Sequence, residues 1–385
     1  MSRKGVLERR VRQSYEKIPY PKPGRKTSRA ISDSLVPLPW LEAFAGRTVS
    51  APRILVAGCG TGAEAIFLGR EFRAAEVLGI DFSQRSIRYA RRALKQVENR
   101  PSVKFICGDL TDSKLMRQFA NSFDLVWCHG VLSYVPKPVP VLRNLARCLK
   151  PDGLFYLGVN GPAHFSAHYR PATAAVGLDP GRMPSAAVRK TLLSFCDALT
   201  SEGLAKLSDD LLSSDLFAPF MNNLALSQWV GLACQAGLQF RGEYGAYRRV
   251  LRALGEITVR SEFRCSRAEL HHLTRLLVPP VFNRILFTFA REPTIDWSAN
   301  SLMTLRPRLT NLYAARQSGA CLRLTSNSLK HLIEIEDTRW EAAFLRCCDG
   351  SRTARQILRQ IPQRVSRKIF RQHLYLFYQA AVLGF

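Results

Sequence analysis

Three glycines at single-residue spacing form the part of the chain that is best suited to hold a ligand. Residues 53–62 read R-I-L-V-A-G-C-G-T-G, and the apolar run ends in Gly58, Gly60 and Gly62. Glycine allows a tight turn and a close approach of the backbone to a ligand, and the helical pattern that follows would offer free N–H groups at its start. The stretch therefore predicts a nucleotide-binding crossover, although the dinucleotide fingerprint G-x-G-x-x-G/A fits the same residues.

Two carboxylates follow the next two apolar runs and favour one class of nucleotide. Asp81 ends the second predicted strand, where a carboxylate can accept hydrogen bonds from both ribose hydroxyls of a nucleoside. Gly108 and Asp109 end the third, where a carboxylate can accept a hydrogen bond from the exocyclic amine of adenine. NAD sites do not usually have this arrangement, so the two positions favour a different adenosyl ligand.

Alternating apolar and amphipathic runs predict the elements that must position these residues. Strands are expected at 54–57, 76–80, 103–107, 123–128 and 154–159, alternating with helices at 63–72, 84–97 and 138–149. A helix at 226–237, a strand at 238–243 and a strand at 284–290 complete the pattern. Such alternation implies a parallel sheet with right-handed crossovers, and the last pieces suit a seven-stranded sheet with a reversed final strand.

With these motifs the chain resembles the class I S-adenosylmethionine-dependent methyltransferases over residues 53–293. The resemblance implies an α/β fold, with a Rossmann-like methyltransferase sheet of seven strands and helical insertions. It implies that the glycines lie beside the methionine part of the cofactor, that Asp81 binds the ribose, and that Asp109 and Leu110 lie around the adenine. The residues that would bind S-adenosylmethionine are Ala57, Gly58, Cys59, Gly60, Thr61, Gly62, Asp81, Phe82, Gly108, Asp109, Leu110, Cys128 and His129.

Further segments are similar to one bacterial set of methyltransferases. They are S-Y-E-K-I-P-Y-P at 14–21, F-D-L-V-W-C-H-G-V-L-S-Y-V-P at 123–136 and L-K-P-D-G-L-F-Y-L-G-V-N at 149–160. The set comprises enzymes with a regulatory domain, including protein-lysine methyltransferases, and enzymes fused to tetratricopeptide repeats, which are absent here. The tail, R-L-T-N-L-Y-A-A-R through C-C-D-G-S-R-T-A-R-Q-I-L, is similar to the C-terminal winged helix of the lysine group. A protein acceptor, including lysine, is implied.

One position departs from the methyltransferase pattern. Most class I enzymes carry an acidic residue two places before the first glycine, where it helps to hold the methionine end of the cofactor, and here that residue is Val56. The main hypothesis is a methyltransferase that acts on a protein or small-molecule acceptor. Val56 leaves a catalytically silent, cofactor-binding regulator as an alternative.

Two side chains near the end of the fourth predicted strand are the candidate catalytic residues, His129 and Tyr134. Methyl transfer is an in-line displacement, so the protein mainly aligns donor and acceptor, and a base is needed only where the acceptor arrives protonated, as lysine does. His129 can instead line the adenine side, and Tyr134 can instead pack in the core. His164 and His168 have helical i, i+4 spacing, but no metal site is predicted.

The chain divides into four predicted parts. Residues 1–47 form a basic N-terminal arm that is a candidate lid, and residues 48–293 form the methyltransferase domain, with helical insertions at about 160–225 and 244–280. Residues 294–301 are a predicted linker, and residues 302–385 are a predicted small winged-helix-like domain.

A formal net charge of +26 favours an acidic partner, unless the whole source proteome is basic. Arg364, Arg367, Lys368 and Arg371 have the spacing of one helical face, which makes nucleic acid a possible partner, with a solvated face as the alternative. An RNA or nucleic-acid methyltransferase or binding protein is therefore a second hypothesis. The Asn/Asp-Pro-Pro-aromatic run of nucleobase amine methylation and the Pro-Cys of cytosine C5 enzymes do not occur.

Cysteine use and hydropathy predict a cytoplasmic protein. The ten cysteines are scattered and include no C-x-x-C pair, which favours a reducing compartment. No apolar run approaches the roughly 18 residues of a membrane helix, so no transmembrane segment is predicted, and the basic N-terminus lacks the apolar region of a secretory signal.

Overall fold

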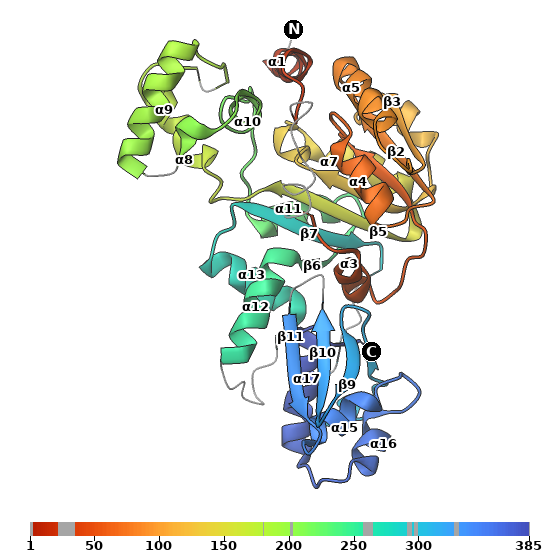
Figure 1. The fold of residues 1–385 in the computed structure, drawn as a ribbon. Coiled ribbons are helices and arrows are strands. Elements are labelled where there is room, and N and C mark those ends of the chain that lie inside the picture. The colour runs from red at the N-terminus through yellow and green to blue at the C-terminus, as the bar shows by residue number, and fades with distance from the viewer. Residues whose placement is uncertain are drawn as a thin grey trace. The chain divides into compact units, whose positions relative to one another are not determined.

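The computed structural model describes residues 3–21, 35–179, 181–200, 203–256, 265–290, 295, 299–326 and 331–384. The chain forms two compact units (Figure 1). Unit 1 comprises residues 1–35, 50–239 and 279–289, and unit 2 comprises residues 36–49, 240–278 and 290–385. The boundaries predicted from the sequence stay predictions, and the predicted linker at 294–301 lies mostly outside the described residues.

A seven-stranded sheet carries the glycine turn, as the sequence predicts. Its strands are β1 (Arg53–Ala57), β2 (Glu76–Asp81), β3 (Val103–Cys107), β4 (Phe123–His129), β5 (Leu149–Asn160), β6 (Gln239–Glu243) and β7 (Phe282–Thr288). The spatial order is β3-β2-β1-β4-β5-β7-β6. Strands β1 to β5 pair in parallel, and β7 pairs antiparallel with β5. The mixed α/β sheet of the predicted fold class, with a reversed late strand, is therefore confirmed.

Parallel pairing brings the carboxyl ends of β1 to β4 to one edge of the sheet. Ile54 to Ala57 are at most 1% exposed, because helices cover both faces of a parallel sheet and a strand there needs apolar side chains on both sides. In β1, Val56 pairs with Gly79 of β2 on one side and with Trp127 of β4 on the other. The residues that follow these strands therefore share one edge.

Strand β5 starts earlier than expected. The sequence predicts a turn at 151–153 and a strand from 154, but β5 runs from Leu149. In its ladder with β4, Leu149 pairs with Phe123, and the next pair is Leu154 with Leu125. Strand β5 therefore has more residues than β4 between these two pairs. The extra residues bulge out of the ladder, which explains why a Pro-Asp-Gly run fits within a strand.

Helices of unit 1 flank the sheet and form an extension beyond it. They are α1 (Arg3–Lys17), α4 (Ala63–Glu71), α5 (Gln84–Lys95), α6 (Ser113–Arg117), α7 (Pro138–Cys148), α8 (Ser166–Ala175), α9 (Ala186–Thr200), α10 (Asp209–Leu211) and α11 (Leu226–Cys234), with 3₁₀ turns at Leu132–Tyr134 and Leu204–Lys206. Residues Leu212–Leu216 form a π-helix. The extension has a small core of its own, made by Tyr169, Leu193, Leu212, Leu216 and Phe217.

Unit 2 combines helices with small antiparallel sheets. Its elements are α3 (Leu38–Ala45), α12 (Tyr244–Glu256), α13 (Arg267–Leu277), α14 (Ala299–Leu302), β8 (Arg308–Leu309), β9 (Ala314–Ser318), β10 (Cys321–Ser326), β11 (His331–Glu336), α15 (Trp340–Arg346), α16 (Ala354–Gln360), α17 (Arg367–Gln379) and β12 (Leu383–Gly384). The order β11-β10-β9 makes a three-stranded sheet, and β12 pairs with β8. A winged helix in particular stays a prediction.

The prediction that Arg364 belongs to a basic face of the last helix is wrong. The Ser366 hydroxyl accepts a hydrogen bond from Ile369 N and caps α17, which begins at Arg367. Arg364 therefore precedes the helix and does not share a face with Arg367, Lys368 and Arg371. The structure gives no support to nucleic acid as a partner.

Candidate functional site

The glycine turn leaves β1 at the edge where the parallel strands end. Gly58, Gly60 and Gly62 have φ angles of +70°, +50° and +89°, which side-chain-bearing residues rarely adopt. The N–H groups of Gly58 and Cys59 donate to Ile80 O at 2.7 and 3.0 Å, which ties the turn to β2. A Cβ on Gly60 would collide with Tyr20 O, so the turn needs glycine there for close packing as well as for conformation.

Asp81 lies directly beside this turn at the end of β2. Its Oδ2 accepts from Gly60 N at 2.9 Å and its Oδ1 accepts from Ser83 N at 2.8 Å. The side chain is only 9% exposed, and burial raises the pKa of the carboxyl. Each carboxylate oxygen can accept a second hydrogen bond, so Asp81 is oriented by the backbone and can still accept from two ligand hydroxyls.

Asp109 follows β3 at the same edge and is already engaged. Its Oδ1 accepts from Thr111 N at 2.8 Å and from the Thr111 hydroxyl at 2.7 Å. Its Oδ2 forms an ion pair with the guanidinium of Arg12, which also lies 5.5 Å above the ring of Phe82. The neighbouring Leu110 O accepts from Asn144 Nδ2 at 2.9 Å. The predicted adenine side of the site is therefore in contact with the N-terminal arm.

The arm contacts three of the loops that surround the predicted cofactor site. Tyr15 meets Phe82 edge-on at a ring-centroid distance of 6.0 Å. Gln84 N donates to Glu16 Oε1 at 2.7 Å, and Thr61 N donates to Tyr20 O at 3.3 Å. These contacts place α1 and the residues after it over the turn, and a lid function for the arm stays a prediction.

His129 ends β4 in an apolar, aromatic environment. Its Nδ1 lies 3.0 Å from the Tyr156 hydroxyl, and its ring lies 4.9 Å from that of Phe282. Burial and the nearby Arg284 lower the pKa of His129 to about 3, so the imidazole is neutral at physiological pH. The preceding Cys128 is buried, and burial raises the pKa of its thiol. These surroundings favour the structural role that the sequence left open for His129.

A carboxylate that sequence analysis missed lies close to the position of Val56. Glu64, in the first turn of α4, places Oε1 3.9 Å from His129 Nε2. Burial raises the pKa of Glu64 to about 7, and the indole of Trp127, the partner of Val56 in the ladder, acts in the opposite direction. Sequence analysis could have found Glu64 because it is a glutamate two residues after Gly62, the last glycine of the turn.

The second predicted catalytic residue leads to another missed carboxylate. The Tyr134 hydroxyl donates to Asp215 Oδ1 at 2.7 Å, and the ring of Tyr134 lies 6.2 Å from that of Tyr15. Asp215 belongs to the π-helix, which is separated from Tyr134 by 81 positions along the chain. No local spacing indicates this pair, because only the fold brings the two segments together.

These residues fit an S-adenosylmethionine ligand. The three glycines add no side chains of their own to the turn, and the N-cap residue Gly62 has no side chain that could occupy the first N–H groups of α4, where an anionic or polar ligand group can bind. The backbone orients Asp81 while leaving lone pairs for ribose hydroxyls. The fit covers the ribose side and the turn, whereas Asp109 would meet an adenine only beside Arg12.

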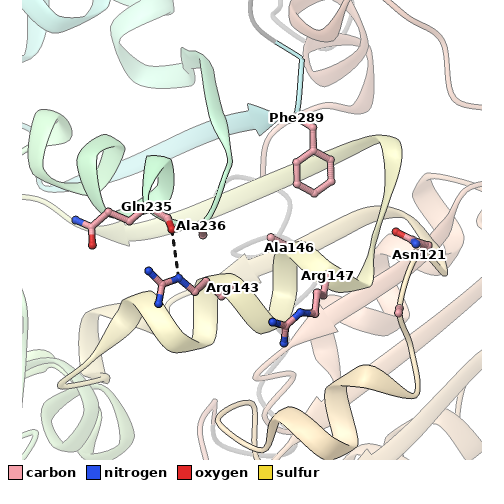
Figure 2. Close-up of a pocket in the computed structure, with 8 residues that line it drawn as sticks. Asn121, Arg143, Ala146, Arg147, Gln235, Ala236 and Phe289 are labelled. Carbon is pink, nitrogen blue, oxygen red and sulfur yellow. Dashed lines mark hydrogen bonds between the residues drawn. The ribbon is translucent and has the colours of Figure 1, made fainter.

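The hollow drawn in Figure 2 lies away from the predicted site. Its volume is about 440 Å³, and it is lined by Ala120, Asn121, Arg143, Ala146, Arg147, Gln235, Ala236 and Phe289. Arg143 Nε donates to Gln235 O at 3.3 Å across it. Asn121 precedes β4 and Phe289 follows the antiparallel β7, so this hollow is at the opposite edge of the sheet from the glycine turn.

The described residues contain neither a helix long and apolar enough to cross a membrane nor a group of three side chains suited to a metal ion. His164 Nδ1 lies 2.7 Å from the Ser166 hydroxyl in a buried position, whereas His168 is exposed. The two histidines with helical spacing therefore do not share one environment.

Known proteins resemble the part of the chain that holds this site. Residues 55–157 match the family described as a methyltransferase domain. A malonyl-[acyl-carrier protein] O-methyltransferase of Halalkalibacterium halodurans is 32% identical over 116 residues, which are 29% of this chain and 40% of that protein. A ubiquinone biosynthesis O-methyltransferase of Neisseria meningitidis is 35% identical over 106 residues, 27% of this chain and 42% of that protein. The chain thus spans less than half the length of these curated relatives.

A solved structure resembles nearly the whole chain. PKMT2 from Rickettsia typhi, in complex with AdoHcy, superposes with a TM-score of 0.52 over 90% of this chain and 75% of that one, at 14% identity. At this identity the likeness shows a shared fold.

Proposed function

We propose that this chain, which carries a class I S-adenosylmethionine-dependent methyltransferase domain, transfers a methyl group to a small-molecule or protein acceptor. The family match over residues 55–157 and the seven-stranded sheet support the domain class. The main support for the proposal is the hydrogen bond from Gly60 N to the Asp81 carboxylate. This bond connects the glycine turn to Asp81 and orients the carboxylate at the position expected to bind ribose.

S-adenosylmethionine, when bound, supplies a methyl group on a sulfonium sulfur, and the C–S bond breaks as the acceptor's lone pair forms the new bond, leaving the electron pair on sulfur. The chain's own residues position the two partners. Asp81 and N–H groups at the start of α4 would hold the cofactor, and Tyr15, Tyr20 and Phe82 would exclude water from it. Alignment of this kind supplies about 7–11 kcal/mol of barrier lowering.

The acceptor remains a choice between two classes. The curated relatives are named as O-methyltransferases of small molecules. The segments at 14–21 and 123–136 instead resemble enzymes that include protein-lysine methyltransferases. Both classes require the same cofactor site.

Isothermal titration with S-adenosylmethionine tests the proposal. The wild type is expected to bind the cofactor, and Asp81→Ala is expected to lose about 1.5–3 kcal/mol of affinity because hydrogen bonds to a charged acceptor have that strength. Glu98→Ala, which removes an exposed carboxylate of the same unit, is the matched control and should bind like the wild type. A folded wild type without affinity, or an Asp81→Ala protein with unchanged affinity, would contradict the cofactor site.

Turnover separates an enzyme from a silent regulator. Incubation with a cell extract as the source of acceptors should convert the cofactor to S-adenosylhomocysteine. Binding without any such conversion would favour the regulator that Val56 suggests.

A further inference from the structure

The two oxygens of the Asp215 carboxylate differ in their hydrogen bonding. Tyr134 Oη and Ser214 Oγ both donate to Oδ1, at 2.7 and 2.8 Å. Among the described residues, Oδ2 accepts no hydrogen bond and no cation pairs with this carboxylate. Burial raises the pKa of Asp215, and the hydrogen bonds from Tyr134 and Ser214 act in the opposite direction. A largely buried carboxylate without a cation is costly, and such groups concentrate at functional sites.

Tyrosine side chains lie beside this carboxylate. Tyr15 and Tyr134 meet edge-on, with a centroid distance of 6.2 Å and an interplanar angle of 72°. Tyr20 lies close enough to act electrostatically on both phenols, and Asp215 acts on Tyr15 as well as on Tyr134. We call Tyr15, Tyr20, Tyr134 and Asp215 the tyrosine cluster. It combines three phenols with one carboxylate.

The tyrosine cluster adjoins the cofactor site through Tyr15. The ring of Tyr15 contacts Phe82 at 6.0 Å, and Asp81, the expected ribose ligand, acts electrostatically on its phenol. Tyr134 follows β4 at the same edge of the sheet as the glycine turn. An acceptor in the tyrosine cluster would therefore lie next to the cofactor.

Two of the nearby charged side chains, Arg170 and Asp179, have partners within the protein. Arg170 Nη1 donates to Leu216 O at 3.2 Å and to Ala218 O, so its guanidinium is directed to the backbone. Asp210 adds a second negative charge near Asp215, and Asp179 forms an ion pair with Arg10 at 2.8 Å. The π-helix that carries Asp215 is itself a form that occurs mainly at functional sites.

We propose that the tyrosine cluster is the acceptor site and that it binds a cationic amine, with Asp215 as its carboxylate partner and Tyr15, Tyr20 and Tyr134 as its ring walls. This inference rests on the proposed function. An ammonium group gains both an ion pair and cation–π contacts there, whereas a neutral hydroxyl gains neither.

Asp215 also has the position to take the amine's proton. The acceptor R–NH₃⁺ gives one proton to Asp215 Oδ2, which leaves R–NH₂ with a free lone pair for the transfer described above. The product is then R–NH₂⁺–CH₃, and the protonated Asp215 releases its proton to solvent. Burial and the positive charge of the cofactor favour this step, since both lower the pKa of an approaching ammonium.

Titration with small probes tests the inference without turnover. The wild type and its variants are titrated with n-butylammonium chloride and with 1-butanol, a neutral molecule of similar shape, and binding is followed by saturation-transfer NMR with and without S-adenosylhomocysteine. We expect the wild type to bind butylammonium about tenfold more tightly than butanol, and Asp215→Asn to remove this preference. The asparagine keeps the acceptor oxygen for Tyr134.

Ring variants separate a binding site from a structural contact. Tyr15→Leu is expected to weaken butylammonium binding several-fold, and Tyr15→Phe, which keeps the ring face, is expected to retain it. If the cluster only fastens α1 to the π-helix, Tyr15→Leu would lower the free energy of unfolding through the lost ring contacts, and neither change would affect amine binding.

Each result decides between the two proposals. If the wild type binds S-adenosylhomocysteine but shows no preference for butylammonium, or if Asp215→Asn keeps the preference, the amine site is wrong and the proposed function stands. If butanol binds as tightly as butylammonium, a hydroxyl acceptor replaces the amine. If S-adenosylhomocysteine does not bind, the proposed function fails, and the titration without cofactor still tests the tyrosine cluster.

Discussion

Two carboxylates, the fully buried Glu243 of unit 2 and the partly exposed Asp215 of unit 1, differ in what surrounds them. Glu243 in unit 2 is fully buried, and its Oε2 lies 2.6 Å from Arg275 Nη2. The N–H groups of Gly245 and Ala246 donate to the same carboxylate. Among the described residues, Asp215 in unit 1 receives hydrogen bonds from two hydroxyl groups, both at Oδ1. A buried charge with a complete set of partners belongs to the architecture, whereas one with an open oxygen is a candidate for a ligand.

The two units also differ in the cations that contact their aromatic rings. In unit 2 the guanidinium of Arg267 lies 4.4 Å from the ring of Phe44 and 4.1 Å from that of Tyr378, so the protein fills its own cation–π position. Among the described residues, no cation lies over the rings of Tyr15 and Tyr134. In the proposed amine site, the acceptor would supply the cation that Arg267 supplies in unit 2.

The largest expected effect is on the compensated carboxylate. Glu243→Ala should lower the free energy of unfolding by about 3–5 kcal/mol, because it leaves the Arg275 charge buried without its partner. Urea unfolding measures this change. Glu334→Ala, which breaks the half-exposed pair with Arg323, is the control and should cost at most about 1 kcal/mol. Equal losses in the two variants would remove the contrast on which the comparison depends.

A second effect comes from Glu64, whose nearest histidine is neutral. Its pKa is raised from 4.5 to about 7 in the folded state. Between these values the unfolded chain releases the proton and the folded chain keeps it, so stability falls as pH rises, by roughly 3 kcal/mol in total. The decline should appear as a fall in the stability of the wild type relative to Glu64→Gln in urea unfolding from pH 4.5 to 8, because the opposite contribution of the neutral His129 is common to both proteins. The exposed Glu98→Gln should behave like the wild type, and an equal pH dependence in the wild type and Glu64→Gln would contradict the assignment.

Asp215→Asn should change stability in the opposite direction from Glu243→Ala. Removing an uncompensated charge while keeping the Tyr134 hydrogen bond is expected to raise the free energy of unfolding by about 0.5–2 kcal/mol, a common gain when a functional residue is replaced. Thermal and urea unfolding at neutral pH measure it. A loss of several kcal/mol would place Asp215 with Glu243 among the structural charges.

The smallest effect is expected at the exposed basic residues of α17. Arg367→Ala and Lys368→Ala should each change the free energy of unfolding by no more than about 0.5 kcal/mol, because both side chains are solvated. RNA retention at low salt should also be the same in both variants. A reduced salt dependence of RNA binding in either one would restore the nucleic-acid hypothesis.

Local sequence patterns determined the sheet and the glycine turn. The strand at 103–107 was predicted to the residue, and the turn at Gly58 to Gly62 was identified because glycine spacing and apolar runs are local properties. The predictions failed where neighbouring elements decide the outcome. The bulge in β5 depends on the ladder with β4, and the start of α17 depends on the Ser366 cap.

The sequence also predicted the cofactor class, through a resemblance carried by the glycine turn and by Asp81 and Asp109, which follow neighbouring strands. Only the tertiary structure decided which further carboxylates accompany them. Glu64 was visible beside the turn, yet its burial against Trp127 and His129 depends on the packing of α4. Asp215 reaches Tyr134 across 81 positions, because a folded insertion brings the π-helix back to the end of β4. Spacing along the chain encodes contacts within an element, and contacts between distant elements exist only after both have packed.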